Sequence, residues 1–313
     1  MKCLVTGGAG FIGSNLVKAL LERGDEVCVL DNFSTGKREN LGPFENRIQL
    51  IEGDIRSYHI VREAVCDIDV IFHQGALPSV PRSINDPITT NQVNVEGTLN
   101  LLDAAKDAGV QRLVYASSSS IYGSNPALPK QEDMMPLPIS PYAVAKMAGE
   151  KYCQAFTRTY GLETVCLRYF NVFGVGQDPK SQYSAVIPLF ITAFLDGGRV
   201  TVHGDGEQSR DFSYIDNVVH ANLLAAEANG AAGEVFNVAC GERTSLNQIL
   251  EHLRAITGLD VEVENVQDRA GDVKHSLADI GKASRILDYR PGVSVEEGLR
   301  RSVAWYRTMR TKA

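Results

Sequence analysis

The stretch Thr6-Gly7-Gly8-Ala9-Gly10-Phe11-Ile12-Gly13 decides the fold, because it joins an apolar strand-like run, Lys2–Thr6, to a helical pattern, Phe11–Arg23. Its first and third glycines permit a tight turn and let the backbone approach a pyrophosphate, and its last glycine lets the helix pack closely on a sheet. The free N–H groups at the helix start favour an anion there. Glycine turns join many strands to helices, so this spacing alone is weak evidence for a dinucleotide site.

The first two thirds of the chain alternate β-rich runs with amphipathic stretches. This alternation predicts an α/β protein whose doubly wound parallel sheet, of the Rossmann type, carries helices on both faces. Right-handed crossovers then place a nucleotide site at the carboxyl ends of the strands. The strand-like runs are Lys2–Thr6, Glu26–Leu30, Ile48–Glu52, Asp69–His73, Arg112–Ala116 and Thr164–Arg168, and the helical stretches include Phe11–Arg23, Gly97–Ala108 and Tyr142–Tyr160.

The pattern loosens after about Asn171, where glycine-rich loops interrupt shorter elements. A strand-like run, Val261–Glu264, precedes the loop Gln267–His275. We therefore expect a Rossmann domain over residues 1–170 and a smaller α/β C-terminal substrate lobe over residues 171–313. Chain segments are expected to cross between the two.

The composition is that of an ordinary globular protein, with 313 residues of which 44% are hydrophobic and 22% charged. Asp and Glu number 38 against 31 Lys and Arg, which argues against a nucleic-acid partner and gives no polybasic membrane signal. No apolar run approaches the roughly 18 residues that a membrane helix needs. Six scattered cysteines without a CxxC pair indicate a cytoplasmic protein, and no His or Cys cluster has the spacing of metal ligands.

Asp31 ends the second strand-like run, at the position where a carboxylate can accept hydrogen bonds from an adenosine ribose. An acid there would repel the extra phosphate of NADP, so the sequence favours NAD. The alternative is that Asp31 caps a helix or a turn. Asp54 and Ile55 follow the third run and are placed to meet the adenine, although an Asp after a strand is also common in turns.

Tyr142 and Lys146 are four residues apart at the start of a helical stretch, so they share one helix face. A phenol with its ordinary pKa of about 10 is a poor base at neutral pH. A lysine ammonium and a positive nicotinamide ring nearby would stabilise the phenolate and bring it into working range. The pairing Tyr–xxx–Lys also occurs by chance in many helices.

Four serines, Ser117-Ser118-Ser119-Ser120, follow the strand-like run Arg112–Ala116 at the same sheet edge as the glycine loop. A hydroxyl there can bond the reacting hydroxyl of a substrate and share its proton with Tyr142. The alternative, a polar turn that needs small residues, explains one or two serines better than four.

With these residues in view, the chain resembles the extended short-chain dehydrogenase/reductase superfamily, and within it the UDP-hexose 4-epimerases. The similarity runs over nearly the whole length, and its many spaced motifs occur in one order. They are Thr6–Ser14, Asp31-Asn32, His73-Gln74-Gly75-Ala76, Asn94, Ser117–Gly123, Tyr142 with Lys146, Arg168-Tyr169-Phe170-Asn171, Gly204-Asp205-Gly206, Arg210-Asp211 and Arg269-Ala270-Gly271-Asp272.

The resemblance implies that Tyr142 is the catalytic base, that Lys146 orients the nicotinamide ribose and that Ser118 stands beside the reacting sugar hydroxyl. The residues expected to bind NAD are Gly7, Gly10, Phe11, Ile12, Gly13, Asp31, Asn32, Asp54, Ile55, Gln74, Ala76, Tyr142 and Lys146. Those expected to bind the UDP-sugar are Ser79, Ser118, Ser119, Ser120, Asn171, Gln177, Ala185, Val186, Arg210, Arg269, Asp272 and Ser276. Arginine forks suit the diphosphate, and a carboxylate suits a ribose diol.

The resemblance also implies what each part of the chain does. NAD binding falls to residues 1–170 and UDP-sugar binding to residues 171–313. The stretches Gly97–Ala108 and Tyr142–Tyr160 resemble the helix pair that forms an intersubunit four-helix bundle in this superfamily, so a homodimer is implied.

The implied reaction is an internal redox cycle through a 4-keto sugar that turns over in the pocket before hydride returns to its other face. Related dehydratases carry Asp-Glu, and related decarboxylases Glu, just after the catalytic hydroxyl. This chain has Ser119 and Ser120 there. The missing acid favours simple epimerisation.

Ser276 stands four residues beyond Asp272, where this family faces the C2 substituent of the sugar. A small residue there admits an N-acetyl group. The stretch Ser79–Ile84, with Gln177 and Ala185, is similar to the subgroup that prefers N-acetylhexosamines, whereas Pro78 replaces the glycine of that subgroup. We therefore expect UDP-N-acetylglucosamine 4-epimerase activity, with UDP-glucose/UDP-galactose as the alternative. An enzyme that modifies UDP-glucuronate and a non-catalytic NAD-sensing protein are the remaining alternatives.

Overall fold

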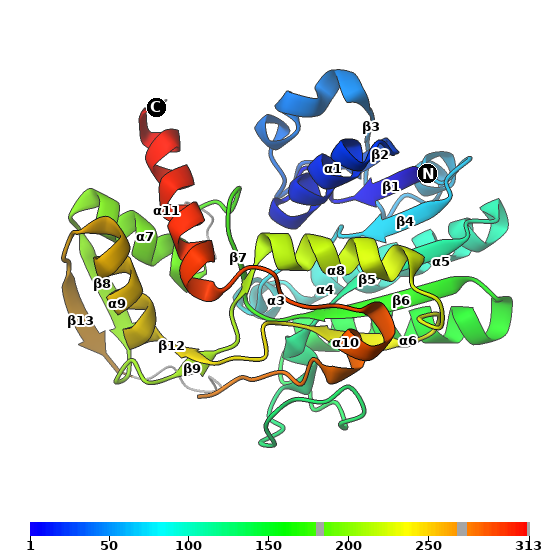
Figure 1. Ribbon diagram of the computed structural model, residues 1–313. Coiled ribbons are helices and arrows are strands. Elements are labelled where there is room, and N and C mark those ends of the chain that lie inside the picture. The colour runs from blue at the N-terminus through cyan, green and yellow to red at the C-terminus, as the bar shows by residue number, and fades with distance from the viewer. Residues whose placement is uncertain (180–184, 268–273, 312–313) are drawn as a thin grey trace.

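The computed structural model describes residues 1–179, 185–267 and 274–311, and a large parallel sheet dominates them (Figure 1). Seven strands form this sheet in the order β11-β6-β5-β4-β1-β2-β3, and neighbouring strands all run parallel. The doubly wound α/β class expected from the alternation is thereby confirmed. The strands are β1 (Lys2–Thr6), β2 (Glu26–Asp31), β3 (Ile48–Glu52), β4 (Val70–His73), β5 (Arg112–Ser118), β6 (Glu163–Tyr169) and β11 (Val235–Val238).

Helices cover both faces of the sheet and bury opposite sides of the same strands. Val5 of β1 joins the core cluster that contains α1 and α8, whereas its neighbour Leu4 joins the cluster that contains α2, α5 and α6. The strands are therefore apolar on both sides, as buried parallel strands are. The helices are α1 (Phe11–Arg23), α2 (Tyr58–Ala64), α5 (Gly97–Ala108), α6 (Pro141–Tyr160) and α8 (Ile215–Glu227).

The strand order reverses beside β1, which lies between β2 and β4. The loops that leave β1 and β4 therefore part in opposite directions at the carboxyl ends of the strands, the place where doubly wound folds bind their ligands. Short elements surround this region. They are η1 (Arg38–Asn40), η2 (Gly42–Arg47), α3 (Val80–Asn85), α4 (Pro87–Asn91), the π-helical turn η3 (Gln92–Glu96) and η4 (Ser119–Tyr122).

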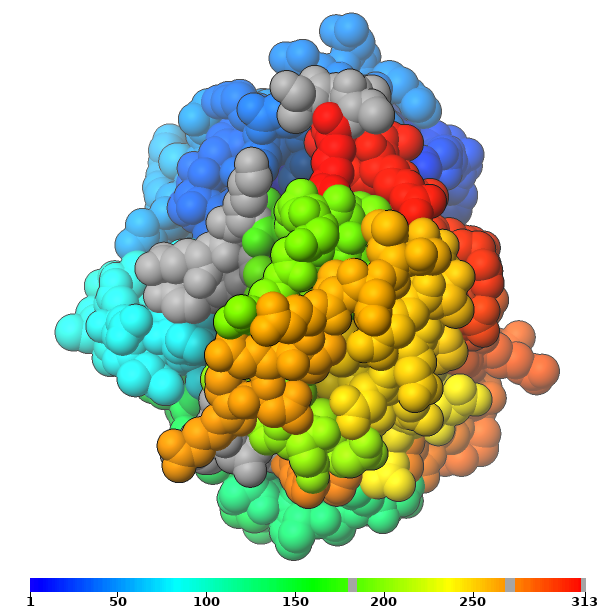
Figure 2. Space-filling view, turned by 90° about the vertical axis from the view of Figure 1, so that its left-hand side faces the viewer, coloured from blue at the N-terminus to red at the C-terminus, as the bar shows by residue number. Residues whose placement is uncertain are grey.

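The smaller lobe lies beside the sheet and pairs strands that are distant in sequence. Its two-stranded sheets join β8 to β13, β9 to β12 and β7 to β10. In Figure 2 the yellow to orange segments of α9 and β13 occupy the middle of the face that the lobe presents. The elements are β7 (Val172–Phe173), α7 (Val186–Asp196), β8 (Arg199–His203), β9 (Ser209–Arg210), β10 (Ser213–Tyr214), β12 (Thr244–Ser245), α9 (Leu246–Thr257), β13 (Glu262–Val266), α10 (Gly281–Leu287) and α11 (Val295–Thr311).

Two elements from the second half of the chain belong to the large sheet. β11 pairs with β6 as its edge strand, and α8 contacts β5, β6 and α1. Segments thus cross between the two parts of the molecule. In the described ranges, no helix has both the length and the apolar character needed to span a bilayer.

The strand β5 extends two residues beyond its expected end. β5 runs to Ser118 rather than to Ala116, so Ser117 and Ser118 are strand residues and only Ser119 and Ser120 begin the following 3₁₀ turn. The reason is that β6 continues to Tyr169 alongside and supplies the ladder partners of both serines.

Candidate active site

The glycine loop after β1 is packed so closely that side chains are excluded from two of its positions. Gly7 has φ +68°, and a Cβ there would lie 2.7 Å from Cα of Gly75 in the loop after β4. A Cβ on Gly13 would lie 2.1 Å from the carbonyl oxygen of Gly7. A Cβ on Gly10 would meet only that same oxygen, at 3.2 Å, so this side of the loop faces open space.

Gly10 is also the N-cap residue of α1 and supplies no side-chain cap. The N–H groups of the first turn, at Phe11, Ile12 and Gly13, therefore point beyond the helix start without intrahelical partners. Open space beside Gly10 and donors at a helix N-terminus are what a pyrophosphate requires, so the loop fits the phosphate part of a dinucleotide.

Asp31 both holds the glycine loop and keeps acceptor capacity. Its Oδ2 accepts a hydrogen bond from the N–H of Ala9 at 2.9 Å, and its Oδ1 accepts one from the N–H of Phe33 at 2.8 Å. The side chain is buried, and burial raises the pKa of this carboxyl above its ordinary value. Each oxygen retains a second lone pair, so the turn-holding role and the ribose-binding role are compatible.

The residues expected at the adenine lie together after β2 and β3. Asn32 Nδ2 donates to Asp54 Oδ2 at 2.8 Å, and Arg56 donates to both oxygens of Asp54, which lowers the pKa of this carboxyl to about 2. Ile55 is buried next to these polar groups. A cavity of about 390 Å³ starts at Asn32 and Arg56 and continues past Leu77 towards α3 and α4.

A hydrogen-bond chain through His73 fixes the end of β4. Thr98 Oγ1 donates to the carbonyl oxygen of Asn94 at 2.8 Å, so it accepts from His73 Nε2, 2.9 Å away. The proton therefore sits on Nε2, and His73 Nδ1 accepts from Thr6 Oγ1 at 2.7 Å. Burial, with the nearby charge of Lys146, lowers the pKa of His73 to about 3, so the ring stays neutral.

The loop after β4 is held by the same residues. The N–H of Gly75 donates to Thr6 Oγ1 at 3.1 Å, and the side chain of Asn94 bonds both the N–H and the carbonyl of Leu77, at 2.8 and 3.0 Å. Gln74 points its amide at Tyr169 and Asn222, and Ala76 lies between the anchored positions. This loop therefore meets the glycine loop in a fixed position.

Tyr142 lies in the first turn of α6 because the helix starts at a defined point. Ser140 Oγ accepts the N–H of Ala143 at 3.2 Å, Pro141 occupies the first helical position, and Gly161 ends the helix in the left-handed conformation. Burial raises the pKa of Tyr142, and the nearby Ser118 hydroxyl acts in the opposite direction. The structure therefore brings the expected base and the expected hydroxyl together.

The hydroxyl oxygen of Ser118 accepts two hydrogen bonds from the turn that follows it. Ser118 Oγ accepts from the N–H of Ser120 at 3.2 Å and from Ser120 Oγ at 2.9 Å. Its proton is thus left for Tyr142. Ser119 and Ser120, which begin the 3₁₀ turn η4, add two further hydroxyls here.

Lys146 lies one turn beyond Tyr142 and is fully enclosed. Its Nζ donates to the carbonyl oxygen of Ala116 at 2.7 Å and lies 5.0 Å from the centre of the Tyr115 ring. Burial lowers the pKa of Lys146 to about 8, so the ammonium form still predominates at neutral pH.

The residues expected to hold the UDP-sugar come from the smaller lobe and from β6. Arg210 donates to the carbonyl oxygens of Ser209 and Lys274, at 3.1 and 3.0 Å, and the N–H of Ser276 donates to the carbonyl oxygen of Ser209 at 3.0 Å. Arg210 and Ser276 are thus neighbours across β9. Asn171, with φ +34°, follows β6 and donates to the carbonyl oxygen of Asp211 at 3.2 Å.

The other expected sugar-contacting residues start or end local elements. Ser79 is the N-cap of α3 and has φ +95°, a rare conformation for serine. Ala185 is the N-cap of α7, and Val186 begins that helix. Gln177 lies in the loop after β7, and its buried Oε1 has no hydrogen-bond partner within the described ranges. Arg269 and Asp272 lie outside the described residues.

Sequence reasoning overlooked Glu150 and assigned no role to Asp211 or His73. The carboxylate of Asp211 accepts the N–H groups of Cys240, Gly241 and Ala278, at 2.8, 3.0 and 3.2 Å, and burial raises its pKa to about 6. Glu150 could have been found, because it repeats the four-residue spacing of Tyr142 and Lys146. Asp211 gives no local signal, since its three partners come from distant segments.

Comparisons with known proteins find epimerases both among protein families and among solved structures. A model of the NAD dependent epimerase/dehydratase family matches residues 3–239. The chain is similar to a UDP-glucose 4-epimerase from Thermotoga maritima crystallised with UDP-glucose (40% identity, TM-score 0.94, 99% of each chain covered). It is also similar to a UDP-N-acetylglucosamine 4-epimerase from Methanobrevibacter ruminantium in complex with UDP-N-acetylmuramic acid (41%, 0.94, 98% of each chain). A third structure, a Thermus thermophilus UDP-glucose 4-epimerase in complex with NAD, is 37% identical with a TM-score of 0.89, covering 98% of this chain and 99% of that one.

Proposed function

The chain belongs to the NAD dependent epimerase/dehydratase family, and from that premise we propose that it interconverts UDP-N-acetylglucosamine and UDP-N-acetylgalactosamine. The resemblance seen in the sequence is confirmed at the level of the UDP-sugar 4-epimerases. The observation that carries the proposal is the neighbouring pair Ser118 and Tyr142, in a protein whose glycine loop is shaped for a dinucleotide and which has no acid at positions 119 and 120.

NAD is the cofactor of this family, and the site fits it. When bound, it supplies a hydride acceptor and donor next to carbon 4 of the sugar. In our proposal the open side of Gly10 and the first turn of α1 hold the pyrophosphate, Asp31 takes the adenosine ribose, and Asn32, Asp54 and Ile55 border the adenine. Gln74 and Ala76 would line the nicotinamide side, with Lys146 beneath its ribose.

The proton path needs only two side chains. Tyr142 takes the proton of the sugar 4-hydroxyl, and Ser118 shares it through its own hydroxyl. Desolvation raises the pKa of this half-buried phenol, so a positive charge must stabilise the phenolate before it can act as a base at neutral pH. Lys146, one turn away and protonated at that pH, provides this charge.

The outcome after oxidation depends on which proton donors the pocket offers. Elimination from a 4-keto sugar needs a second acid and base near the ring. Ser119 and Ser120, at the start of η4, offer neutral hydroxyls instead. The keto sugar can then only be reduced again, from either face, which gives epimerisation at carbon 4.

The choice of an N-acetylated sugar rests on two residues of the proposed sugar pocket, Ser276 and Gln177. Ser276 is small, so an acetamido group at carbon 2 has room. The buried Oε1 of Gln177 lacks a donor among the described residues, and an amide N–H of the sugar would supply one. Ser79, Ser119, Ser120, Ala185 and Val186 would complete the sugar pocket.

The proposed nucleotide contacts are Asn171, Arg210, Arg269 and Asp272. UDP-glucose/UDP-galactose is the second candidate substrate pair, because a similar structure holds UDP-glucose. The division of the chain into an NAD part, 1–170, and a UDP-sugar part, 171–313, belongs to the same proposal.

The test is direct. Purified enzyme is incubated separately with UDP-N-acetylglucosamine, UDP-glucose and UDP-glucuronate, and the products are separated by chromatography. We expect a 4-epimer from the acetylated sugar at a higher kcat/KM than from UDP-glucose. Conversion of UDP-glucuronate alone would refute the substrate assignment, and no conversion of any sugar with NAD bound would favour a sensing role.

We also propose a cytoplasmic homodimer. The six cysteines are all free thiols, which suits a reducing compartment. α5 and α6 contact each other, and α6 exposes Val144 and Tyr152 to solvent, a surface that a second copy would cover. Light scattering at micromolar concentration tests this, and a monomer would refute it.

A further inference from the structure

Three successive turns of α6 attach to three consecutive residues of β5. Tyr142 lies beside Ser118, and Lys146 Nζ donates to the carbonyl oxygen of Ala116 at 2.7 Å. The residue between them in β5, Ser117, donates from Oγ to Glu150 Oε2 at 3.0 Å. Positions 142, 146 and 150 lie on one helix face, so Glu150 continues the row formed by the proposed catalytic pair.

Glu150 is itself held by a buried arginine. Arg168 on β6 donates from Nε to Glu150 Oε2 at 3.0 Å and from Nη2 to Glu150 Oε1 at 2.7 Å. Side-chain exposure is 2% for Arg168 and 0% for Glu150. The guanidinium also lies 4.8 Å from the centre of the Tyr122 ring and donates from Nη1 to the carbonyl oxygen of Glu132. Both partners are therefore fixed in orientation as well as in place.

A buried ion pair of this kind is a poor source of stability, because desolvation offsets much of the attraction and apolar residues of similar volume do as well. A paired, two-point contact does supply geometry. Here the contact reaches the side-chain hydroxyl of Ser117, and the next residue along β5 carries the hydroxyl that lies beside Tyr142.

We propose that Glu150 and Arg168 are positioning residues that act through Ser117 to hold the Ser118 hydroxyl against the Tyr142 phenol. The inference rests on the proposed function, since it assigns Ser118 and Tyr142 to the proton path. Neither positioning residue touches substrate. Loss of their contact lets the end of β5 shift and moves the Ser118 hydroxyl away from the Tyr142 phenol.

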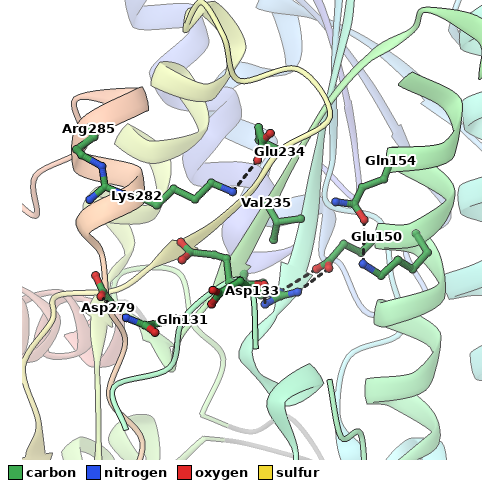
Figure 3. A pocket seen from close by; sticks show the side chains of 12 residues that line it. Gln131, Asp133, Glu150, Gln154, Glu234, Val235, Asp279, Lys282 and Arg285 are labelled. Atoms are coloured by element: carbon green, nitrogen blue, oxygen red, sulfur yellow. Dashed lines mark hydrogen bonds and ion pairs between the residues drawn. The ribbon is translucent and has the colours of Figure 1, made fainter. Parts of the chain in front are cut away.

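A cavity of about 410 Å³ reaches this ion pair from outside the sheet (Figure 3). In that view Glu150 and Gln154 of α6 lie on one side, and Lys282 and Arg285 of α10 lie on the other. Lys282 is paired with Glu234 at 2.7 Å. The cavity has room for a small planar cation next to Glu150, which permits a chemical rescue.

The experiment uses the holoenzyme with Arg168→Ala, assayed with and without millimolar guanidinium. We expect kcat to fall about 100-fold with KM for the UDP-sugar little changed, as for misplacement of a reacting group by about 1 Å. Guanidinium should restore most of the lost kcat, because it can rebuild the two-point contact with Glu150. Ethylammonium, which lacks the planar fork, should not. Arg285→Ala, in the same cavity but away from Glu150, is the matched control and should behave as wild type under both conditions.

A second pair of variants covers failure of Arg168→Ala to fold. Ser117→Ala removes only the hydroxyl that donates to Glu150, and Glu150→Gln keeps the shape of the side chain while removing its charge. Both should lower kcat and leave NAD content unchanged. An unchanged kcat in Ser117→Ala would overturn the positioning role. So would a raised KM with an unchanged kcat in both Ser117→Ala and Glu150→Gln.

A readout without turnover separates this inference from the proposed function. In protein labelled with ¹³C at tyrosine Cζ, the pKa of Tyr142 should rise in Ser117→Ala, because a more distant Ser118 hydroxyl stabilises the phenolate less. An unchanged pKa would contradict the inference even if the enzyme epimerises every sugar offered. A raised pKa in an enzyme that converts no UDP-sugar would leave the positioning role intact and reject the proposed function.

Discussion

Lys146 donates its ammonium proton to the carbonyl oxygen of Ala116, two residues before the hydroxyl that meets Tyr142. The lysine therefore supports the strand that carries Ser118 as well as supplying positive charge. Burial lowers its pKa to about 8, which places its titration inside the range where an enzyme can be assayed.

The first prediction concerns this lysine. The ammonium is present below pH 8 and lost above it, so kcat of the wild type should decline on the alkaline side with an apparent pKa near 8. Lys146→Arg keeps its charge across that range, so its decline should be weaker or absent. Measuring kcat from pH 6 to pH 10 tests this, and the same alkaline limb in both enzymes would show that another group titrates.

Tyr142→Phe removes the proposed base and leaves the ring in place. We expect kcat to fall by about 10²–10⁴, the range for loss of a general base, with NAD still bound. Product analysis gives the first quantity, and the absorbance of released cofactor gives the second. Turnover close to that of the wild type would assign the proton to another group.

Alanine substitutions at two glycines of the loop after β1 should have different effects. Gly13→Ala places a Cβ 2.1 Å from a backbone oxygen, so it should lower the free energy of unfolding. Gly10→Ala meets only one oxygen at 3.2 Å, but its methyl enters the space proposed for the pyrophosphate. It should weaken NAD binding while unfolding by urea stays close to wild type. Equal NAD retention in Gly10→Ala and wild type would contradict that placement.

Asp211→Asn should destabilise the protein at neutral pH. Three N–H groups point at the two carboxylate oxygens, and an amide must turn its NH₂ towards at least one of them. The loss should be about 1–3 kcal/mol, the usual effect of an unsatisfied buried donor, measured by urea unfolding at pH 7. A variant as stable as the wild type would show that the segments are held by other contacts.

The wild-type carboxyl adds a pH dependence of known sign. Its pKa of about 6 is above the unfolded value of about 3.9, so the folded state binds more protons between these values. The contribution of Asp211 to stability therefore falls as pH rises from 4 to 6. The difference in unfolding free energy between wild type and Asp211→Asn should change through that window and stay constant above pH 7.

Ser276→Tyr should separate the two candidate substrate pairs. The ring would fill the space proposed for the acetamido group, so kcat/KM for UDP-N-acetylglucosamine should drop by on the order of 100-fold while that for UDP-glucose changes little. Parallel loss for both sugars would indicate that the substitution disturbs β9 rather than the sugar pocket.

Much of the fold was predictable because its signals are local. The bounds of β1, β3, α1 and α5 match the strand-like and helical runs read from the sequence, since apolar runs, amphipathic periodicity and glycine turns mark them. The strand nature of Ser117 was not predictable, because small polar residues after an apolar run suggest a turn. Their conformation depends on the neighbouring strand, which continues to Tyr169.

The candidate site divides in the same way. The glycine loop and the Tyr142–Lys146 pair could be predicted from the sequence, because each depends on residues that are only a few positions apart. The pairing of Glu150 with Arg168 joins a helix to the next strand, and the bonds of Asp211 join three segments. Such contacts depend on tertiary geometry, for which one sequence holds no local pattern.

The position of β11 at the sheet edge has a consequence for synthesis of the protein. When residues 1–170 have emerged from the ribosome, six of the seven strands of the large sheet are present. The strand β6 then lacks its edge partner β11. The exposed edge can pair with other nascent chains until residues 235–238 emerge. Completion of the nucleotide-binding sheet is therefore tied to the later half of translation, and a truncated chain ending at residue 170 should aggregate rather than fold alone.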